Sequence, residues 1–212
     1  MKILSLNVRG LGAVPKKVAL KWLLATTSPT VLLLQETMSK GKKAEEAVKE
    51  CIKGWGMTNN DADGHSGGTL TAWSPALNLI SVHRFGTVVG TKLEDSETGK
   101  HFMILNIYGS FYDRKTFWER LEGSGAMDLP DLILGGNLNL TLTSNEVWGK
   151  NARSDSLRPF FSHLFKHKDL IDLAPINLIP TWRNRRGGEN DISKRLDRFL
   201  VVENLIRSDL IL

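Results

Sequence analysis

Four polar residues lie within a few positions after apolar runs that have the composition of buried strands: Asn7, Glu36, Asn137 and Asn139. In layered α/β proteins, ligand sites gather at strand ends, so such side chains can meet although they are far apart in sequence. Converging carboxylate and amide oxygens suit a hard cation, and Mg²⁺ prefers one or two carboxylates with water and phosphate oxygens. Residues that merely end strands are the alternative. Spacing alone favours that alternative, because such residues are common in turns.

The elements that would position these residues are visible as two kinds of pattern. Helical patterns occupy 15–27, 41–53, 113–121 and 157–167. Strand patterns occupy 3–8, 31–34, 70–73, 79–85, 88–93, 102–108, 132–134, 180–183 and 196–201. In the first helix we expect Val18, Trp22 and Leu23 on the buried face, and we expect Asp113 to cap the third helix. Strand–helix units around a run of antiparallel strands predict a layered α/β sandwich.

Composition limits the class of protein. The 212 residues carry a formal net charge of +5, and the pI is near 9.3. This excess suits a polyanion without requiring one. The single cysteine, Cys51, excludes an intramolecular disulfide and a cysteine-rich zinc site. No apolar run approaches the roughly 18–20 residues of a membrane helix, and the N-terminus resembles a strand rather than a signal peptide. We therefore expect a nuclear or cytoplasmic protein with no membrane partner and no obligate protein partner.

Six short strings form an ordered series along the chain: Ser5–Leu11, Leu34–Thr37, Ser66–Leu70, Asn106–Gly109, Leu134–Asn139 and Lys194–Leu200. In this order and spacing they resemble the endonuclease/exonuclease/phosphatase superfamily, whose members include exonuclease III-like and DNase I-like enzymes. The wording of the first and last strings is most similar to plant LINE-type non-LTR retrotransposon endonucleases. The resemblance runs from about residue 2 to residue 202.

The resemblance implies a fold, a substrate and a metal. The fold is a four-layered α/β sandwich of two packed mixed sheets flanked by helices, here a single domain over residues 1–212. The activity is Mg²⁺-dependent hydrolysis of DNA phosphodiester bonds, with Mn²⁺ as the alternative metal. Glu36 is the implied metal ligand, supported by Asn7 and Asn139, and Tyr108 is implied to contact the phosphate or the leaving group.

Two departures from the family pattern lead us to expect a damaged active site. Position 137 is Asn where the family has Asp, and an amide cannot serve as a general base. Asp197 matches an aspartate that orients a histidine in a final Ser-Asp-His string, but this sequence has no such string. Ser208-Asp209-Leu210 is no substitute, because leucine has no acid–base chemistry. We therefore expect a C-terminally truncated domain that lacks the final strand.

A basic loop and five histidines complete the candidate residues. Trp182, Arg183, Asn184, Arg185 and Arg186 match a family segment that lines the DNA groove, and arginines beside an aromatic suit phosphate contact and stacking. A solvated basic loop is an equally good explanation. His65 is a candidate phosphate contact, although a turn residue is the simpler interpretation. We expect the pair His163 and His167 to lie exposed on a helix, and we assign no role to the remaining two histidines.

Two functional hypotheses follow, and the sequence leaves open whether the chain is an active enzyme. One is a Mg²⁺-dependent endonuclease, impaired by Asn137 and by the missing Ser-Asp-His strand. The other is a non-catalytic remnant of a retrotransposon that binds nucleic acid. A phosphoesterase for phosphoinositides or lipids shares the fold, and the basic loop and the retrotransposon-like strings disfavour it.

Overall fold

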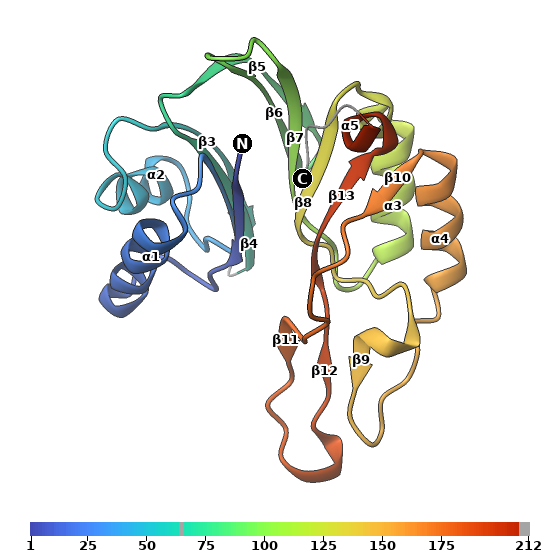
Figure 1. Ribbon diagram of the computed structural model, residues 1–212. Coiled ribbons are helices and arrows are strands. Elements are labelled where there is room, and N and C mark those ends of the chain that lie inside the picture. Colours follow the sequence, from blue (N-terminus) through green and yellow to red (C-terminus); the bar gives the residue numbers. More distant parts are fainter. Residues whose placement is uncertain (64–65, 208–212) are drawn as a thin grey trace.

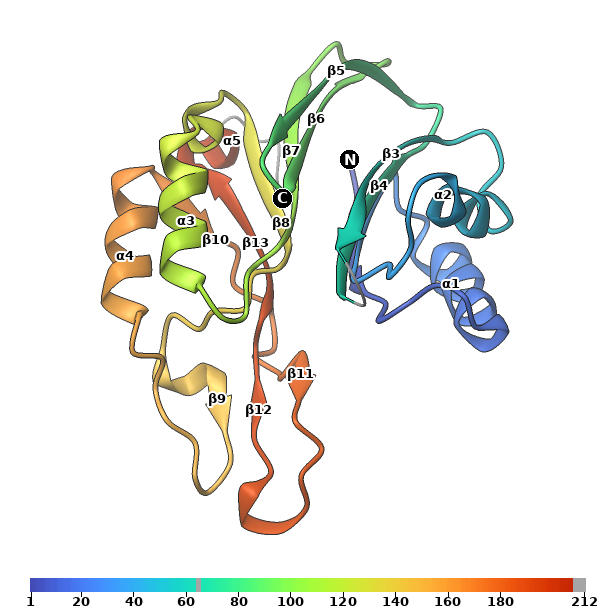
Figure 2. The ribbon, with the colours of Figure 1, turned by 180° about the vertical axis from the view of Figure 1, so that it is seen from behind.

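The computed structural model describes residues 1–63 and 66–207. Figures 1 and 2 show four layers, in which two β-sheets lie face to face and a pair of helices covers the outer face of each. This confirms the predicted α/β sandwich. His65 and the Ser208-Asp209-Leu210 string lie outside the described residues. Within the described part of the chain, no helix combines the length and the apolar character needed to cross a membrane.

The first sheet has four strands. Their order across the sheet is β1 (Ile3–Asn7), β2 (Val31–Gln35), β4 (Ser66–Trp73) and β3 (Gly56–Asp63). β1 and β2 are parallel, and the other pairs are antiparallel. Helices α1 (Val14–Thr27) and α2 (Lys42–Lys49) cover the outer face, where leucines from α1 and the buried pair Ala44 and Val48 from α2 pack against Leu32 and Leu34.

The second sheet has six strands. Their order is β10 (Leu170–Asp172), β13 (Asp197–Val202), β8 (Leu132–Asn137), β7 (His101–Tyr108), β6 (Val88–Asp95) and β5 (Leu77–Phe85). β7 and β8 are parallel, and β13 runs antiparallel to β8. Helices α3 (Arg114–Gly123) and α4 (Arg158–His167) cover the outer face, where the buried rings of Trp118 and Phe161 meet edge to face. As expected, the exposed rings of His163 and His167 stack on the outer side of α4.

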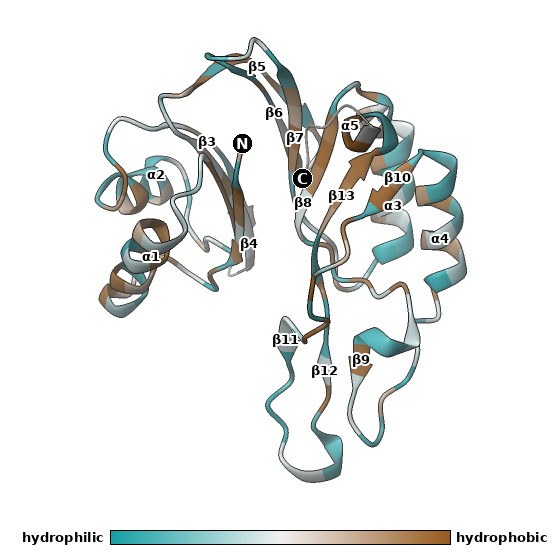
Figure 3. Ribbon diagram, in the orientation of Figure 1, coloured by the Kyte–Doolittle hydropathy of each residue, from teal (hydrophilic) through white to brown (hydrophobic). Residues whose placement is uncertain are grey.

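The two sheets meet through an apolar core and a group of buried hydrogen bonds made by Asn106 of β7. Figure 3 shows apolar residues along β8 and β13 of the six-stranded sheet, and Leu33 and Ile104 belong to the core cluster between the two sheets. At one end of this core, Gln35 donates from Nε2 to Oδ1 of Asn106 over 2.8 Å. Both side chains are fully buried. Because buried amides must be satisfied, this bond fixes the sheets relative to each other beside the ends of β2 and β7.

A small three-stranded sheet extends from one end of the sandwich (Figure 1). It consists of β11 (Trp182–Arg183), β12 (Ser193–Lys194) and β9 (Val147–Trp148). We refer to residues 147–148 and 181–194 as the arm. Short helices complete the described fold: η1 (Ala126–Asp128), η2 (Ser144–Glu146), η3 (Gly188–Asn190) and α5 (Glu203–Arg207).

Two local predictions were wrong. Val18 and Trp22 are 61% and 66% exposed, and α1 buries Leu20 and Leu24 instead. This helix carries apolar residues on two faces, so its pattern does not determine which face is covered. Asp113 occupies the N-cap position of α3 as predicted, but the expected side-chain hydrogen bond is absent. Strand β3 was not predicted, because an edge strand rich in Asn and Asp lacks the usual apolar alternation.

Candidate active site

Strand direction brings the candidate residues to one end of the sandwich. Parallel pairing places the C-terminal ends of β7 and β8 side by side, with Tyr108 opposite Asn137. β13 runs the other way, so it begins at this end, and Asp197 lies opposite Asn137 on the other side. Tyr108, Asn137 and Asp197 therefore form one row across the sheet. On the facing sheet, Asn7 ends β1 and Glu36 directly follows β2.

Glu36 and Asn7 are held together by a hydrogen bond. The Asn7 Nδ2 atom donates to Oε1 of Glu36 over 2.7 Å. Glu36 itself adopts a left-handed backbone conformation with φ of 51°, and so do Arg9 and Asn139 at 46° and 52°. Non-glycine residues in this conformation are strained, and such residues cluster at functional sites. The strained turns direct these side chains toward the end of the sandwich.

Tyr108 lies beside Glu36. Burial raises the pKa of the Tyr108 phenol, and hydrogen bonding to Glu36 and the negative charge of Glu36 raise it further, to about 12. A hydrogen bond involving Asn139 acts in the opposite direction. The phenol therefore stays protonated at neutral pH and is available as a hydrogen-bond donor. These interactions also link Glu36 on one sheet to Tyr108 and Asn139 on the other.

Asn137 and Asn139 belong to one hydrogen-bonded turn. Asn137 is 3% exposed, and its Oδ1 accepts from the backbone N–H of Asn139 over 3.1 Å. Its backbone oxygen accepts from the N–H of Gly109 over 2.8 Å, while Nδ2 of Asn139 donates to the backbone oxygen of Gly109 over 2.6 Å. Gly109 must be glycine, because a Cβ atom there would lie 2.3 Å from the backbone oxygen of Leu138.

Asp197 is a half-buried carboxyl at the start of β13. Burial raises the pKa of Asp197, a hydrogen bond from Thr181 partly offsets this rise, and the charge of Glu36 adds to it. Of the four histidines among the described residues, His101 begins β7 at the opposite end of the strand from Tyr108. The other three lie on β5 and α4.

One cleft joins these residues to the arm. A cavity of about 480 Å³ is lined at one side by Asn7, Asn137 and Asp197 and at the other by arm residues such as Trp182 and Arg185. A hollow of equal volume and a smaller one lie elsewhere, near α4 and β10. They lack this convergence of amides, carboxyls and arginines. Of the site residues predicted from the sequence, Asn7, Asn137 and Asp197 therefore share one cleft with Trp182, Arg183 and Arg185 of the basic loop.

The five arm residues named from the sequence differ in their surroundings. Arg183 forms an ion pair with Asp191, so part of its positive charge is already neutralised within the arm. Asn184 holds the loop together, since its Oδ1 accepts from the N–H groups of Arg186 and Ile192, both over 3.1 Å. Trp182 is half-buried, whereas the side chains of Arg185 and Arg186 are exposed.

Comparison with solved structures identifies the architecture. The endonuclease domain of TRAS1, a telomere-specific non-LTR retrotransposon, superposes with a TM-score of 0.74 at 17% identity, covering 97% of this chain and 87% of that one. The 3'-5' exonuclease NExo from Neisseria meningitidis gives 0.76 at 19% identity, covering 98% and 89%. An AP endonuclease from Archaeoglobus fulgidus gives 0.74 at 18% identity, covering 98% and 88%. The chain has the endonuclease/exonuclease/phosphatase fold. No family model and no curated protein sequence matches it.

The donor set at the end of this endonuclease/exonuclease/phosphatase fold is compatible with a hard divalent cation. No cluster of three or more His, Cys, Asp or Glu side chains suited to a metal occurs within residues 1–63 and 66–207. Mg²⁺ does not require such a cluster, because it keeps several waters and binds through one or two carboxylates. Glu36 supplies one carboxylate, Asp197 lies within its electrostatic reach, and the amides of Asn7 and Asn139 add oxygen donors.

Sequence reasoning missed two residues next to this site. The Arg9 side chain lines the cleft, and its positive charge partly offsets the rise in the pKa values of Tyr108 and Asp197. Lys16, at the start of α1, donates from Nζ to the backbone oxygens of Val8, Arg9 and Gly10. It thereby holds the strained turn that presents Arg9. The sequence signal that could have identified Arg9 is its position, two residues after the strand-end residue Asn7.

The raised pKa of Asp197 predicts that its charge opposes folding. A carboxyl whose folded pKa exceeds its unfolded value binds protons more tightly in the folded state, so stability falls as the pH rises from below about 4 through the folded pKa. We expect Asp197→Asn to raise the Tm at pH 7 and to lose this advantage near pH 3.5. At roughly 2–4 °C per kcal/mol for this chain length, a shift of a few degrees is expected in thermal melts.

Asp191→Asn is the matched control. Hydrogen bonding to Arg183 lowers the pKa of Asp191, so removing this carboxylate should lower the Tm at pH 7 rather than raise it. If both substitutions shift the Tm in the same direction, the assigned environment of Asp197 is wrong.

Proposed function

We propose that this chain binds DNA along the cleft between the strand-end site and the arm, and that it hydrolyses phosphodiester bonds slowly in the presence of Mg²⁺. The observation that carries the proposal is the continuity of one cleft from Asn7, Asn137 and Asp197 to the aromatic and arginine side chains of the arm. A phosphate-binding site alone would suit many ligands. A basic arm with an aromatic residue extending from it suits a long polyanion with bases.

The chain's own residues divide into binding and orienting roles. Glu36, with Asn7 hydrogen-bonded to it, would hold the metal ion. When bound, Mg²⁺ supplies positive charge that polarises the scissile phosphate. Tyr108, kept protonated by its raised pKa, donates a hydrogen bond to a phosphate or leaving oxygen. Arg9 adds charge from the side of the cleft.

One observation favours a second candidate function, a protein that binds DNA without cutting it. The buried residue in the middle of the row is Asn137, whose Oδ1 already accepts the N–H of Asn139. Its amide cannot remove a proton from an attacking water. The resemblance of the sequence to retrotransposon endonucleases, which carry Asp here, supports nuclease ancestry for either candidate.

Binding through the arm predicts a specific salt dependence. We expect Arg185→Ala/Arg186→Ala to weaken binding of a labelled 20-base-pair duplex, measured by fluorescence anisotropy. Both side chains are exposed, so the substitution removes phosphate contacts without disturbing the core. The plot of log K against log salt has a negative slope, and each lost phosphate contact reduces its magnitude by about 0.9. The slope should therefore become shallower by about 2 for the double variant.

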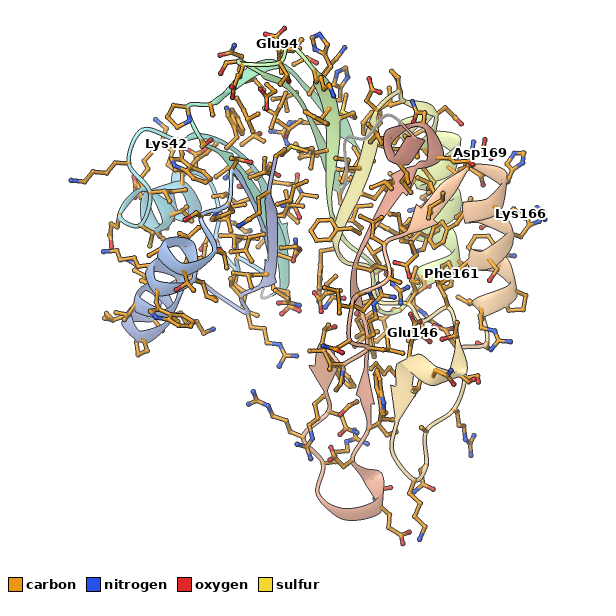
Figure 4. All side chains as sticks on the ribbon, in the orientation of Figure 1. Lys42, Glu94, Glu146, Phe161, Lys166 and Asp169 are labelled. Carbon is orange, nitrogen blue, oxygen red and sulfur yellow. The ribbon has the colours of Figure 1, made fainter. Side chains whose placement is uncertain are left out.

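The control removes the same charge elsewhere. Lys42 and Lys43 are exposed on α2. Figure 4 shows that Lys42 lies far from the arm. Lys42→Ala/Lys43→Ala should leave the slope unchanged. Equal losses from both double variants would mean that net charge, rather than the arm, drives binding. The absence of any binding by the unmodified chain would overturn the proposed function itself.

A further inference from the structure

The loop that follows Tyr108 is fastened at both ends to Asn139. At its start, the backbone oxygen of Gly109 accepts from Nδ2 of Asn139 over 2.6 Å. At its end, Nη1 of Arg114 donates to the backbone oxygen of Asn139 over 3.3 Å. Residues 110–113 therefore project from the active-site turn as a short, closed loop. Phe111 lies two residues after Gly109, so its Cα is within about 7 Å of the Cα of Gly109.

Two adjacent aromatic side chains at the tip of this loop are exposed. Phe111 is 67% exposed and Tyr112 is 89% exposed. Their rings meet edge to face with centroids 5.1 Å apart and an interplanar angle of 88°. Single exposed apolar residues are ordinary on protein surfaces, but neighbouring exposed aromatics beside a polar site are typical of interaction surfaces. In the edge-to-face arrangement, each ring keeps at least one face open.

The charge of this loop differs from that of the arm. Between Gly109 and Arg114 the only ionisable groups are Asp113 and the Tyr112 phenol. Arg114 itself is engaged in an ion pair with Asp155. The loop therefore offers ring faces and no free positive charge, which suits a nucleobase better than a phosphate. Base–aromatic stacking contributes to binding with every base, because each base has a π-face.

We propose that Phe111 and Tyr112 stack on an unpaired base next to the phosphate held by the site, so that the favoured substrate is DNA with an unpaired nucleotide there. This inference rests on the proposed function, because it assumes that DNA occupies the cleft. In a continuous duplex the bases are stacked on one another, and the rings could engage one only after its displacement, which costs free energy. A gap or a single-stranded segment avoids that cost.

The test compares two labelled DNAs, one a continuous duplex and one with a single-nucleotide gap opposite 2-aminopurine. We expect the unmodified chain to bind the gapped DNA at least about fivefold more tightly, the lower end of the effect of one base–aromatic stack. 2-Aminopurine fluorescence should be quenched on binding. Phe111→Ser/Tyr112→Ser should abolish the preference and the quenching while keeping the affinity for continuous duplex, which depends on the arm.

Trp22→Ser is the control, since Trp22 is a similarly exposed aromatic on α1. It should change neither readout. Equal affinity of the unmodified chain for both DNAs, or a double variant that keeps the preference, would overturn the stacking inference while leaving the proposed function intact. Failure of the unmodified chain to bind either DNA would overturn both.

Discussion

Asn137→Asp is expected to raise the rate of Mg²⁺-dependent nicking of supercoiled plasmid by about 10²–10⁴-fold, the typical contribution of general-base catalysis. The substitution is nearly isosteric, so the turn with Asn139 is preserved. The new carboxylate would lie between Tyr108 and Asp197 in the row across the sheet. It would add both a proton acceptor and a negative charge beside the Glu36 site.

A stability measurement separates this chemistry from simple tolerance of the substitution. Asp197 is the direct cross-strand neighbour of position 137, and like charges directly opposite each other are destabilising. We therefore expect Asn137→Asp to have a lower Tm than the unmodified chain in EDTA. Mg²⁺ should recover more of the Tm in this variant than in the unmodified chain, because a ligand stabilises the state that binds it more tightly.

Two controls make the result interpretable. Asn137→Leu should give no gain in nicking, and Glu36→Gln combined with Asn137→Asp should cancel the gain, because the metal-holding carboxylate is gone. A gain that survives Glu36→Gln would point to a contaminating nuclease. If Asn137→Asp binds DNA and Mg²⁺ but nicks no faster than the unmodified chain, the non-catalytic function is the correct one.

The sequence was sufficient to find the strand ends but not their geometry. Asn7, Glu36 and Asn137 each follow an apolar run, and local composition predicts both the strand and the polar residue after it. That these ends meet depends on the parallel pairing of β1 with β2 and of β7 with β8. Long-range pairing leaves no local signal. Here the resemblance of the motifs to a known family predicted that these strand ends meet, and the strand pairing in the structure agrees with that prediction.

Burial of charge was the hardest feature to predict. In the string Arg195–Arg198 the charged residues have the appearance of solvent-exposed positions, yet both arginines are at most 5% exposed. Their partners, Glu146 and Asp172, come from η2 and β10, far away in the sequence. Dependence on distant partners also explains why the buried face of α1 was predicted incorrectly, since the covered face of a helix depends on what packs against it.

This buried network supports the second large prediction. Arg195 contacts Glu146 and Asp172, each at 2.7 Å, and Arg198 contacts them at 3.0 and 2.8 Å. Glu146 lies where the arm joins the six-stranded sheet (Figure 4), and Asp197 is between the two arginines in sequence. The network therefore holds both the arm and the start of β13 in place beside the active site.

Glu146→Gln is expected to destabilise the chain by about 3–5 kcal/mol at pH 7, because removing one partner leaves buried arginine charge uncompensated. Burial raises the pKa of Glu146, but hydrogen bonds and charge from Arg198, with further bonds from Leu142 and Arg195, outweigh burial and lower it. A carboxyl with a lowered folded pKa contributes stability above its unfolded pKa and loses it as the pH falls through the folded value.

Urea unfolding at several pH values provides the measurement. Gln is a neutral mimic of protonated Glu, so the difference between Glu146→Gln and the unmodified chain should be greatest at pH 7. It should shrink below pH 4.5, the ordinary pKa of a glutamate. Glu189→Gln, which removes the carboxylate of an exposed ion pair with Lys150, should cost little at any pH. A difference for Glu146→Gln that does not change with pH would show that lost shape or hydrogen bonding, rather than the charge of this carboxylate, supports the junction between the arm and β13.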